Sequence, residues 1–561
     1  MILFLAALAF ADPTVDALED ELVRNVTKLQ LEDSSHPYFL SYQLLEEDEI
    51  SITASLGSVV REWRSPSRVL GVGVRVGDPE VDSSHFGSRW DNHGFDSRRL
   101  GIEASPAEIR RAGWLLADAQ YKTAVENLSG KLASRRGRTD MKRAPDFAPT
   151  EGVQFEAPAR TLPSSDNLTQ ICRELSAIFL KHPDIGWSET SCSASAGRKV
   201  ILDSSDTRVS MPTRNATVHA AGSIRAEDGT YAWDGAGWIV GAVDDLPGLE
   251  VMKAATEEAA QRLEAWAAAP VLEDEYAGPV LFTGDAAVAL FAQLLLPALS
   301  GTPEMDELGF SGDVEPGKDP LRLKRRILPL GYRVVDDPLA NPALPSSFTH
   351  DDAGAEAQRV EVIEDGLVRN LLMSHIPNKD VGETNGHARG GIGEELTGQP
   401  SNVTVTPDRE VSWKKLVKQG LALAATYELD HILLVRSLKD EELEGEGLPG
   451  FFSMIIMGGG DEESDLMAPL DVVRLYKDGR EERVRGLEVG GADLRTLRDI
   501  VAAGAENTKI FYYSTGDGYG DESVPVTVTA PDVLIGEMVF VPREGTSPEA
   551  PRLQSPLQAG N

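Results

Sequence analysis

Cysteine is scarce in this sequence of 561 residues, in which only Cys172 and Cys192 occur. Two cysteines are too few for a disulfide-rich scaffold, a cysteine-based zinc knuckle or an iron–sulfur cluster. If the protein is exported, the two could form one disulfide across their separation of 20 residues. Cys172 also lies on the apolar face of an expected helix, so the alternative is a buried free thiol.

Basic residues are outnumbered, with 54 Lys and Arg against 90 Asp and Glu, which gives a formal net charge of −36. This imbalance argues against broad electrostatic binding of nucleic acid or anionic lipid. No run after the N-terminus reaches the ~20 apolar residues of a membrane span, so none is expected. The hydrophobic share of 41% indicates real cores, and 52 Gly with 33 Pro favour a turn-rich protein with many strands.

Several motifs of known chemistry are missing from the sequence, among them GxSxG, GxxxxGK[ST], CxxC and HExxH. The closest trio of histidines along the chain is His350, His375 and His387. These three could hold a metal ion if they met across a β-structure. The alternative is that they are exposed or turn histidines beside unrelated acids.

The N-terminus begins with an apolar run from Ile2 to Ala11 that ends in Ala9-Phe10-Ala11. This pattern predicts a secretory signal peptide over residues 1–11 with an A-x-A cleavage site, although a basic n-region is missing. The protein is then expected to be periplasmic or extracellular. The alternatives are a buried N-terminal segment or a misplaced start codon, and in that case the protein is expected to be cytoplasmic.

Local patterns predict strands and helices along most of the chain. Strands are expected at 39–44, 50–54 and 69–76, with the acidic cluster 46–49 as a solvated turn. Residues 130–165 read as a linker whose basic run is either a solvated loop or a docking segment for an acidic partner. Helices are expected at 106–128, 167–181, 250–268, 285–296, 412–426 and 491–504, strands at 198–240 and through much of 327–541, and a disordered tail at 542–561.

Residues 346–391 contain three turn motifs in a fixed order: Asp351-Asp352-Ala353-Gly354, Ile363-Glu364-Asp365-Gly366 and Asn385-Gly386-His387-Ala388-Arg389. This stretch resembles the TldD/PmbA family of metallopeptidases, also called modulators of DNA gyrase. Segments 54–76 and 524–540 resemble the opening and closing strands of that family, so the resemblance covers about 40–541. It implies an α+β fold: an N-terminal α/β domain (12–270) with a sheet flanked by helices, and a β-rich C-terminal domain (271–541) with a curved or barrel-like sheet.

The family carries its chemistry on a helix with the motif HExxxH, and a Cys near the C-terminus completes a zinc site. Alignment on this helix places Ala292, Gln293 and Pro297 at the three motif positions, and the Cys position falls near Asp517. None of these side chains replaces the zinc ligands or the catalytic Glu, so the resemblance implies that no zinc is bound here. Pro297 predicts that the helix ends near Leu296, with leucines 290, 294, 295 and 296 filling the former cavity.

The resemblance therefore favours a catalytically inactive, TldE-like member that partners an active TldD-like zinc subunit in peptide proteolysis. Two alternatives remain open: an exported peptide-binding protein on the same scaffold, and a peptidase with a relocated metal site at His350, His375 or His387. The expected partner is a TldD-like subunit or, in a homodimer, a second copy of this chain, with a peptide as ligand. Residues carried over as candidates for a peptide cleft are Asp351, Asp352, Asn385 and Arg389. Each could equally make a hydrogen bond that stabilises its loop.

Overall fold

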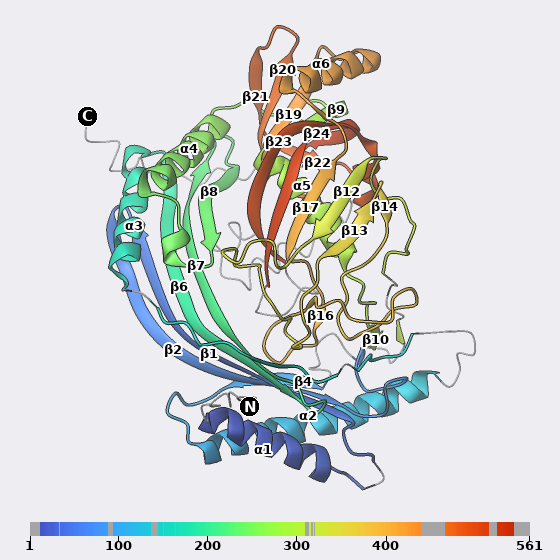
Figure 1. The fold of residues 1–561 in the computed structure, drawn as a ribbon. Helices are drawn as coiled ribbons and strands as arrows, with labels where there is room; N and C mark the ends of the chain where they lie inside the picture. The colour runs from blue at the N-terminus through green and yellow to red at the C-terminus, as the bar shows by residue number, and fades with distance from the viewer. Residues whose placement is uncertain are drawn as a thin grey trace, which may run out of the picture.

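The computed structural model describes residues 12–32, 34–87, 94–135, 144–149, 151–162, 164–308, 314–315, 318, 320–438, 466–514 and 524–543. The signal peptide expected over 1–11, the neighbourhood of Asp517 and the tail after 543 lie outside these ranges and stay predictions. The fold is α+β, as expected, and consists of two large sheets with helices (Figure 1).

The N-terminal half is built on a long, arched sheet that sweeps around one side of the molecule in Figure 1. Seven strands pair in the order β4-β2-β1-β6-β7-β5, and β8 also pairs with β7. Their bounds are β1 (Phe39–Ser55), β2 (Ser58–Arg75), β4 (Phe95–Arg99), β5 (Gln154–Glu156), β6 (Ile185–Asp203), β7 (Arg208–Arg225) and β8 (Tyr231–Val240). Four of these strands are 17 to 19 residues long, which gives the sheet its reach.

The acidic cluster 46–49 lies in the middle of β1, so the prediction of a turn there was wrong. Arginines on the two neighbouring strands offset the repulsion within the cluster: Arg68 and Arg198 each lie 2.6 Å from the Glu46 carboxylate. Arg64 lies 2.9 Å from Asp48. Opposite charges paired across strands stabilise a sheet, and here they allow one continuous strand where local composition indicates a break.

The α-helices described in the N-terminal half, α1 to α4, cover the same face of this sheet. Leu40, Tyr42 and Leu44 of β1 pack with α1 (Pro13–Lys28) and α2 (Pro106–Arg135). Ile52 and Ala54, further along the same strand, pack with α3 (Asp166–Ser176) and α4 (Leu249–Ala267). These positions are all even-numbered on one regular strand, so they share a face. The odd-numbered face turns toward the C-terminal half. Helix α1 had not been predicted, although its N-cap, Asp12, accepts the N–H of Thr14.

The expected linker at 130–165 contains the end of one helix and the short strand β5 in its described parts. Helix α2 continues to Arg135, and Lys131 is buried, with its ammonium 2.7 Å from Asp146. The reading of the basic run as a solvated loop is thus wrong for Lys131. Residues 136–143 lie outside the described ranges.

Cys172 and Cys192 are both buried free thiols, so the disulfide alternative is corrected. Cys172 Sγ lies 3.2 Å from the carbonyl of Thr190 and 3.4 Å from that of Ile52, which accept its weak hydrogen bonds. The thiol serves to pack α3 against the sheet.

The C-terminal half contains a mixed sheet of twelve strands in the described residues. Its main path runs β14-β13-β12-β17-β24-β9-β19-β20-β21, and β18, β22 and β23 join it at the side, so the described strands do not close into a barrel. The bounds are β9 (Tyr276–Phe282), β12 (Tyr332–Asp336), β13 (Val360–Glu364), β14 (Leu367–Val368), β17 (Asn402–Pro407), β18 (Glu410–Val411), β19 (His431–Leu438), β20 (Pro469–Tyr476), β21 (Glu481–Val484), β22 (Leu487–Val489), β23 (Ile500–Ser514) and β24 (Val524–Pro542).

Shorter elements complete the fold. Helices α5 (Asp285–Leu295) and α6 (Trp413–Ala424) pack on the C-terminal sheet, β3 (Phe86–Gly87) joins β10 (Asp306–Leu308) and β11 (Val314–Glu315), and β15 (Ala388–Arg389) pairs with β16 (Thr397–Gly398). No helix in the described ranges is long and apolar enough to cross a membrane.

The helix expected at 491–504 was wrong. Asp493 and Thr496 form a capping box for a single 3-10 segment, Leu494–Asp499, and the chain then enters β23. From Ile500 onward, residues with a helical pattern in the sequence form a strand instead, because they pair with β24.

Candidate functional site

Helix α5 lies where the family resemblance puts the zinc-binding helix, and it is packed into the largest apolar core. The four leucines expected to fill the former cavity, Leu290, Leu294, Leu295 and Leu296, are all buried, with exposed fractions of 5% or less. The helix ends at Leu295 and a 3-10 turn, Leu296–Leu299, follows. Both the plug and the helix end are therefore confirmed.

The three positions aligned with the family motif have structural roles in this chain. Ala292 is buried in the apolar core. The Gln293 side-chain oxygen accepts the backbone N–H of Met467 at 2.9 Å. Pro297 lies in the first turn of the 3-10 segment, where its missing N–H costs little. Neither an alanine methyl nor a proline ring has a lone pair for a metal, so these residues do not fit zinc.

The segment between β12 and β17, which also contains β13 to β16, carries the candidate cleft residues, beginning with Asp351. Its carboxylate accepts backbone N–H groups from Ala353 at 3.0 Å, Ala355 at 2.9 Å and Ala388 at 3.0 Å. Burial raises the pKa of Asp351 to about 7, while the backbone donors act in the opposite direction. Asp351 therefore closes its own turn and fixes β15 beside it.

Asp352 ties this loop to the free face of the N-terminal sheet. Its carboxylate lies 2.7 Å from the ammonium of Lys199, and its carbonyl accepts the side-chain N–H of Gln43 at 2.9 Å. Gln43 also accepts the N–H of Gly393 at 3.1 Å. A side chain at Gly71 on β2 would collide with the Gly393 backbone. Glycine is thus required where the loop touches the sheet.

Asn385 and Arg389 are held by the protein itself. Asn385 accepts the N–H of Met373 and donates to the carbonyl of Leu371, both at 2.8 Å. Arg389 is buried, donates to the carbonyl of Pro525 at 3.0 Å, and lies 4.9 Å from the centre of the Phe348 ring. Burial lowers the pKa of this guanidinium. Asp351, Asp352, Asn385 and Arg389 are thus brought onto one loop system, with loop-stabilising contacts for each; their role in a peptide cleft stays a prediction.

The three histidines proposed as metal ligands have separate partners. His350 packs on Phe155 with ring centres 4.3 Å apart, and His375 stacks on Phe147 at 5.6 Å. His387 is fully buried, with Nε2 3.1 Å from Asp336 Oδ1. Among the residues that the structure describes, no three His, Cys, Asp or Glu side chains are placed to hold a metal ion.

Asp336 is one of the residues that sequence reasoning missed. It is fully buried at the end of β12 and accepts the backbone N–H of Ser401 at 2.7 Å as well as contacting His387. The Ser401 hydroxyl also donates to it. The available signal in the sequence was an acidic residue at the end of an apolar strand. A carboxylate buried there needs several hydrogen-bond donors around it, which indicates a polar cluster.

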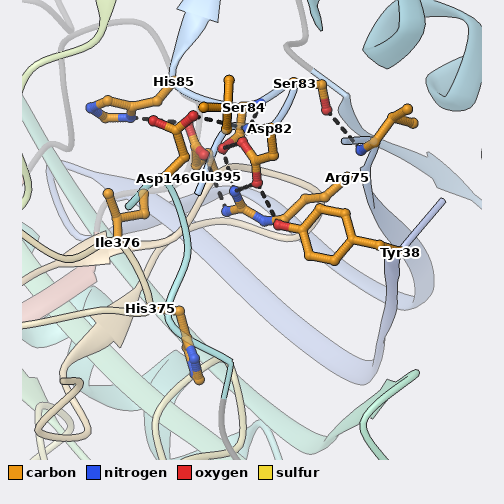
Figure 2. A network of polar contacts seen from close by, with 12 residues as sticks. Tyr38, Arg75, Asp82, Ser83, Ser84, His85, Asp146, His375, Ile376 and Glu395 are labelled. Carbon is orange, nitrogen blue, oxygen red and sulfur yellow. Dashed lines mark hydrogen bonds and ion pairs between the residues drawn. The ribbon is translucent and has the colours of Figure 1, made fainter. Parts of the chain in front are cut away.

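A buried charged network joins the two halves of the molecule and was also missed (Figure 2). Arg75, at the end of β2, lies 3.0 Å from the Asp82 carboxylate and 3.2 Å from that of Glu395. The hydroxyl of Tyr38 donates to Asp82 at 2.6 Å. Burial opposes the charge on Arg75, but these two carboxylates raise its pKa above the ordinary value. The guanidinium is therefore charged and doubly paired inside the protein.

His85 extends this network on the C-terminal side. Its Nδ1 lies 3.5 Å from Glu395, and its Nε2 lies 2.5 Å from the carbonyl of Pro303. The Asp82-Ser83-Ser84-His85 run after an apolar strand was the sequence signal for this site. Figure 2 shows His85, Glu395 and Arg75 converging from different segments.

The His85–Glu395 contact predicts a pH-dependent stability. Burial alone would lower the pKa of His85, but Glu395 raises it above its ordinary value. Stabilisation by protonated His85 is then complete below the unfolded pKa of about 6.5 and is lost as pH rises through the higher folded pKa. In urea unfolding, the stability difference between wild type and His85→Gln should fall by about 1.5–3 kcal/mol from pH 5 to pH 9. Glu395→Gln should flatten the wild-type profile similarly, and an unchanged difference across this range would contradict the assignment.

Comparison with known proteins identifies the domain that carries helix α5 and the segment Asp351–Arg389. Residues 275–440 match the PmbA/TldA metallopeptidase C-terminal domain, a range that includes α5 and the Asp351–Arg389 loop. The similarity to the TldD/PmbA family that the sequence shows therefore covers residues 275–440 of this chain. The chain has no significant match among curated proteins.

Solved structures share the TldD/PmbA fold over 94% of this chain. A candidate modulator of a DNA gyrase from Thermotoga maritima is 15% identical, with a TM-score of 0.56 and all of its chain covered. TldE from Thermococcus kodakarensis is 13% identical, with a TM-score of 0.54 and all of its chain covered. A candidate modulator of DNA gyrase from Bacteroides thetaiotaomicron is 12% identical, with a TM-score of 0.57 and 98% of its chain covered. At these identities the likeness concerns the fold.

Proposed function

We propose that this TldD/PmbA-family protein is a non-catalytic, TldE-like subunit that partners an active zinc peptidase in peptide proteolysis. The observation that carries the proposal is the state of α5. Its Ala292 is packed in the apolar core, its Gln293 binds the backbone of Met467, and Pro297 begins a new turn directly after the helix. The helix that would hold zinc in the family serves here as a structural plug.

Two further features support a scaffolding role over a relocated active site. The residues His350, His375 and His387 are separated by their contacts with Phe155, Phe147 and Asp336. The fold also aligns with that of TldE over nearly the full length of both chains. Peptide hydrolysis in the complex would then depend on zinc in the partner, while this chain would contribute surface to a shared cleft.

Reconstitution with a TldD-like subunit from the same genome tests the proposal. We expect less than about 0.1 equivalent of zinc in the purified chain, no hydrolysis of an unstructured peptide by it alone, and hydrolysis by the mixture that exceeds that of the partner alone. Replacing the catalytic Glu of the partner should abolish this activity, whereas Gln293→Ala in this chain should retain it. Hydrolysis by this chain alone with close to one equivalent of bound metal would overturn the proposal.

A further inference from the structure

Strand β2 presents a long free edge at one side of the N-terminal sheet. It pairs with β1 along its whole length, but β4 covers only residues 69–73 of its other side (Figure 1). The register of β2 with β1 is regular from residue 61 onward. Residues 61–68 therefore form an edge that has no strand beside it among the residues that the structure describes.

The hydrogen bonds at the covered end show which backbone groups point outward from β2. Leu100 donates to the carbonyl of Arg68, and the N–H of Val74 donates to Gly94, on the side away from β1. Even-numbered residues of this strand thus direct their N–H and C=O groups to the edge. Glu62 and Arg64 each offer one donor and one acceptor there, and Pro66 offers only its carbonyl.

Side chains along this edge are unusual for a protected edge strand. Trp63 is 37% exposed and Val60 is 68% exposed. Exposed apolar side chains on an edge strand favour association with another strand. Glu62 and Arg64 flank Trp63 with opposite charges. Arg64 contacts Asp48 of its own chain at 2.9 Å, but its side chain remains 58% exposed. An apolar centre between opposite charges is self-complementary under a twofold rotation.

We propose that two copies of this chain associate by antiparallel pairing of β2 with β2, about a twofold axis at Trp63. This association goes beyond the proposed function and does not depend on it. The pairing places Trp63 opposite Trp63 of the second copy, and Glu62 opposite its Arg64. By symmetry, Arg64 lies opposite Glu62 of that copy. Four backbone hydrogen bonds form between the outward groups of these residues, and the two arched sheets become one.

Other registers of the same pairing are less favourable. An axis at Glu62 or Arg64 places like charges directly opposite each other, which destabilises a sheet pair. An axis at Ser65 places Arg64 opposite Pro66, which lacks the N–H needed for the ladder. Because outward groups occur only at even positions, an axis between two residues would leave them without partners. The axis at Trp63 satisfies both charges and hydrogen bonds.

Side-chain placement also agrees with the axis at Trp63. Glu62 pairs across β1 with Ile52 and Arg64 with Ile50, so both charges lie on the face of the sheet that carries the helices. Trp63 pairs with Ser51 and lies on the opposite face. A non-hydrogen-bonded position, such as that of Trp63 at the new seam, brings side chains closest together. The two indoles therefore meet on one face while the ion pairs form on the other.

Sedimentation of the full-length chain across a concentration series tests the association. We expect a species of twice the 60.6 kDa chain mass at about 50 µM that dissociates on dilution, as an interface of small area should. Glu62→Arg and Arg64→Glu should each weaken the dimer at least about tenfold, because each places like charges opposite one another. The double variant Glu62→Arg/Arg64→Glu should restore it. The matched control Glu126→Arg, an exposed glutamate on α2, should leave it unchanged.

A crosslinking experiment tests the register itself. Trp63→Cys places one thiol opposite its symmetry mate, at the Cα separation that a disulfide needs. Oxidation should give a covalent dimer with this variant, and the native thiols do not interfere because both are buried. Ser65→Cys, on the same face and opposite Arg61 of the second copy, should give none. A strictly monomeric chain, a dimer insensitive to both charge reversals, or equal crosslinking at 63 and 65 would each overturn the proposal.

Discussion

Replacing Arg75 with methionine is expected to lower the free energy of unfolding by about 3–5 kcal/mol, because it removes the counter-charge of the buried Asp82 and of the partly buried Glu395. Asp82 and Glu395 lie 3.0 and 3.2 Å from this guanidinium, and Asp82 has no exposed surface. The Arg75 pair lowers the pKa of Asp82 against the effect of burial. Without Arg75, Asp82 must stay charged inside the protein with only its hydroxyl and backbone N–H donors beside it, or take up a proton. Urea unfolding at pH 7 measures the loss.

Two further variants provide reference values for the loss of unfolding free energy in Arg75→Met. Tyr38→Phe removes only the hydroxyl donor to Asp82 and should cost about 0.5–1.5 kcal/mol. Arg369→Met removes a surface pair with Glu364 whose side chains are 42% and 53% exposed, and it should cost less than about 1 kcal/mol. If Arg75→Met costs no more than Arg369→Met, the network does not hold the two halves together as described.

Phe291→Ala in α5 is expected to cost about 3–5 kcal/mol of unfolding free energy, since it opens a cavity in a fully packed core. Phe291 has no exposed surface and lies on the helix that replaces the family's zinc helix. The expected cavity is lined by apolar side chains, so it should stay dry and bind xenon. Thermal unfolding in the presence and absence of xenon measures both effects.

Val251→Ala on α4 is the matched control, because Val251 is 61% exposed. It should change stability by no more than about 0.5 kcal/mol. A loss below 1 kcal/mol for Phe291→Ala would mean that the region around α5 collapses readily, and that the plug is less rigid than its burial indicates.

Local signals predicted those elements whose causes are local. The end of α5 before Pro297 depends on one residue, and the burial of its leucines follows from a segment that is apolar on all sides; both were confirmed. The course of β1 could not be predicted in this way. Its acidic centre is stable as a strand because Arg198, 152 positions away from Glu46, lies against it. A single sequence does not show which distant cation meets which acid.

In the candidate site, too, local motifs were predictable and contacts with distant residues were not. Asp351, Asp352, Asn385 and Arg389 were identified from the order of turn motifs, and the structure places them on one loop system. The partners that fix them were not predictable, because Lys199 and Gln43 come from the other half of the chain. The network around Arg75 was missed for the same reason: it is assembled from β2, the segment after it, and a residue more than 300 positions away.

The contact between Arg75 and Glu395 also bears on how this chain can be divided. Arg75 belongs to the N-terminal sheet and Glu395 to the C-terminal half, yet each neutralises the other inside the protein. Separation of the chain near residue 270 would leave Glu395 without Arg75 on a newly exposed surface of the C-terminal fragment, whereas Arg75 would keep Asp82 beside it. The boundary that the resemblance implies near residue 270 is thus crossed by an ion pair between the two halves. The arched sheet and the β-rich half are therefore expected to unfold together, because separating them would break this pair and the pair between Lys199 and Asp352.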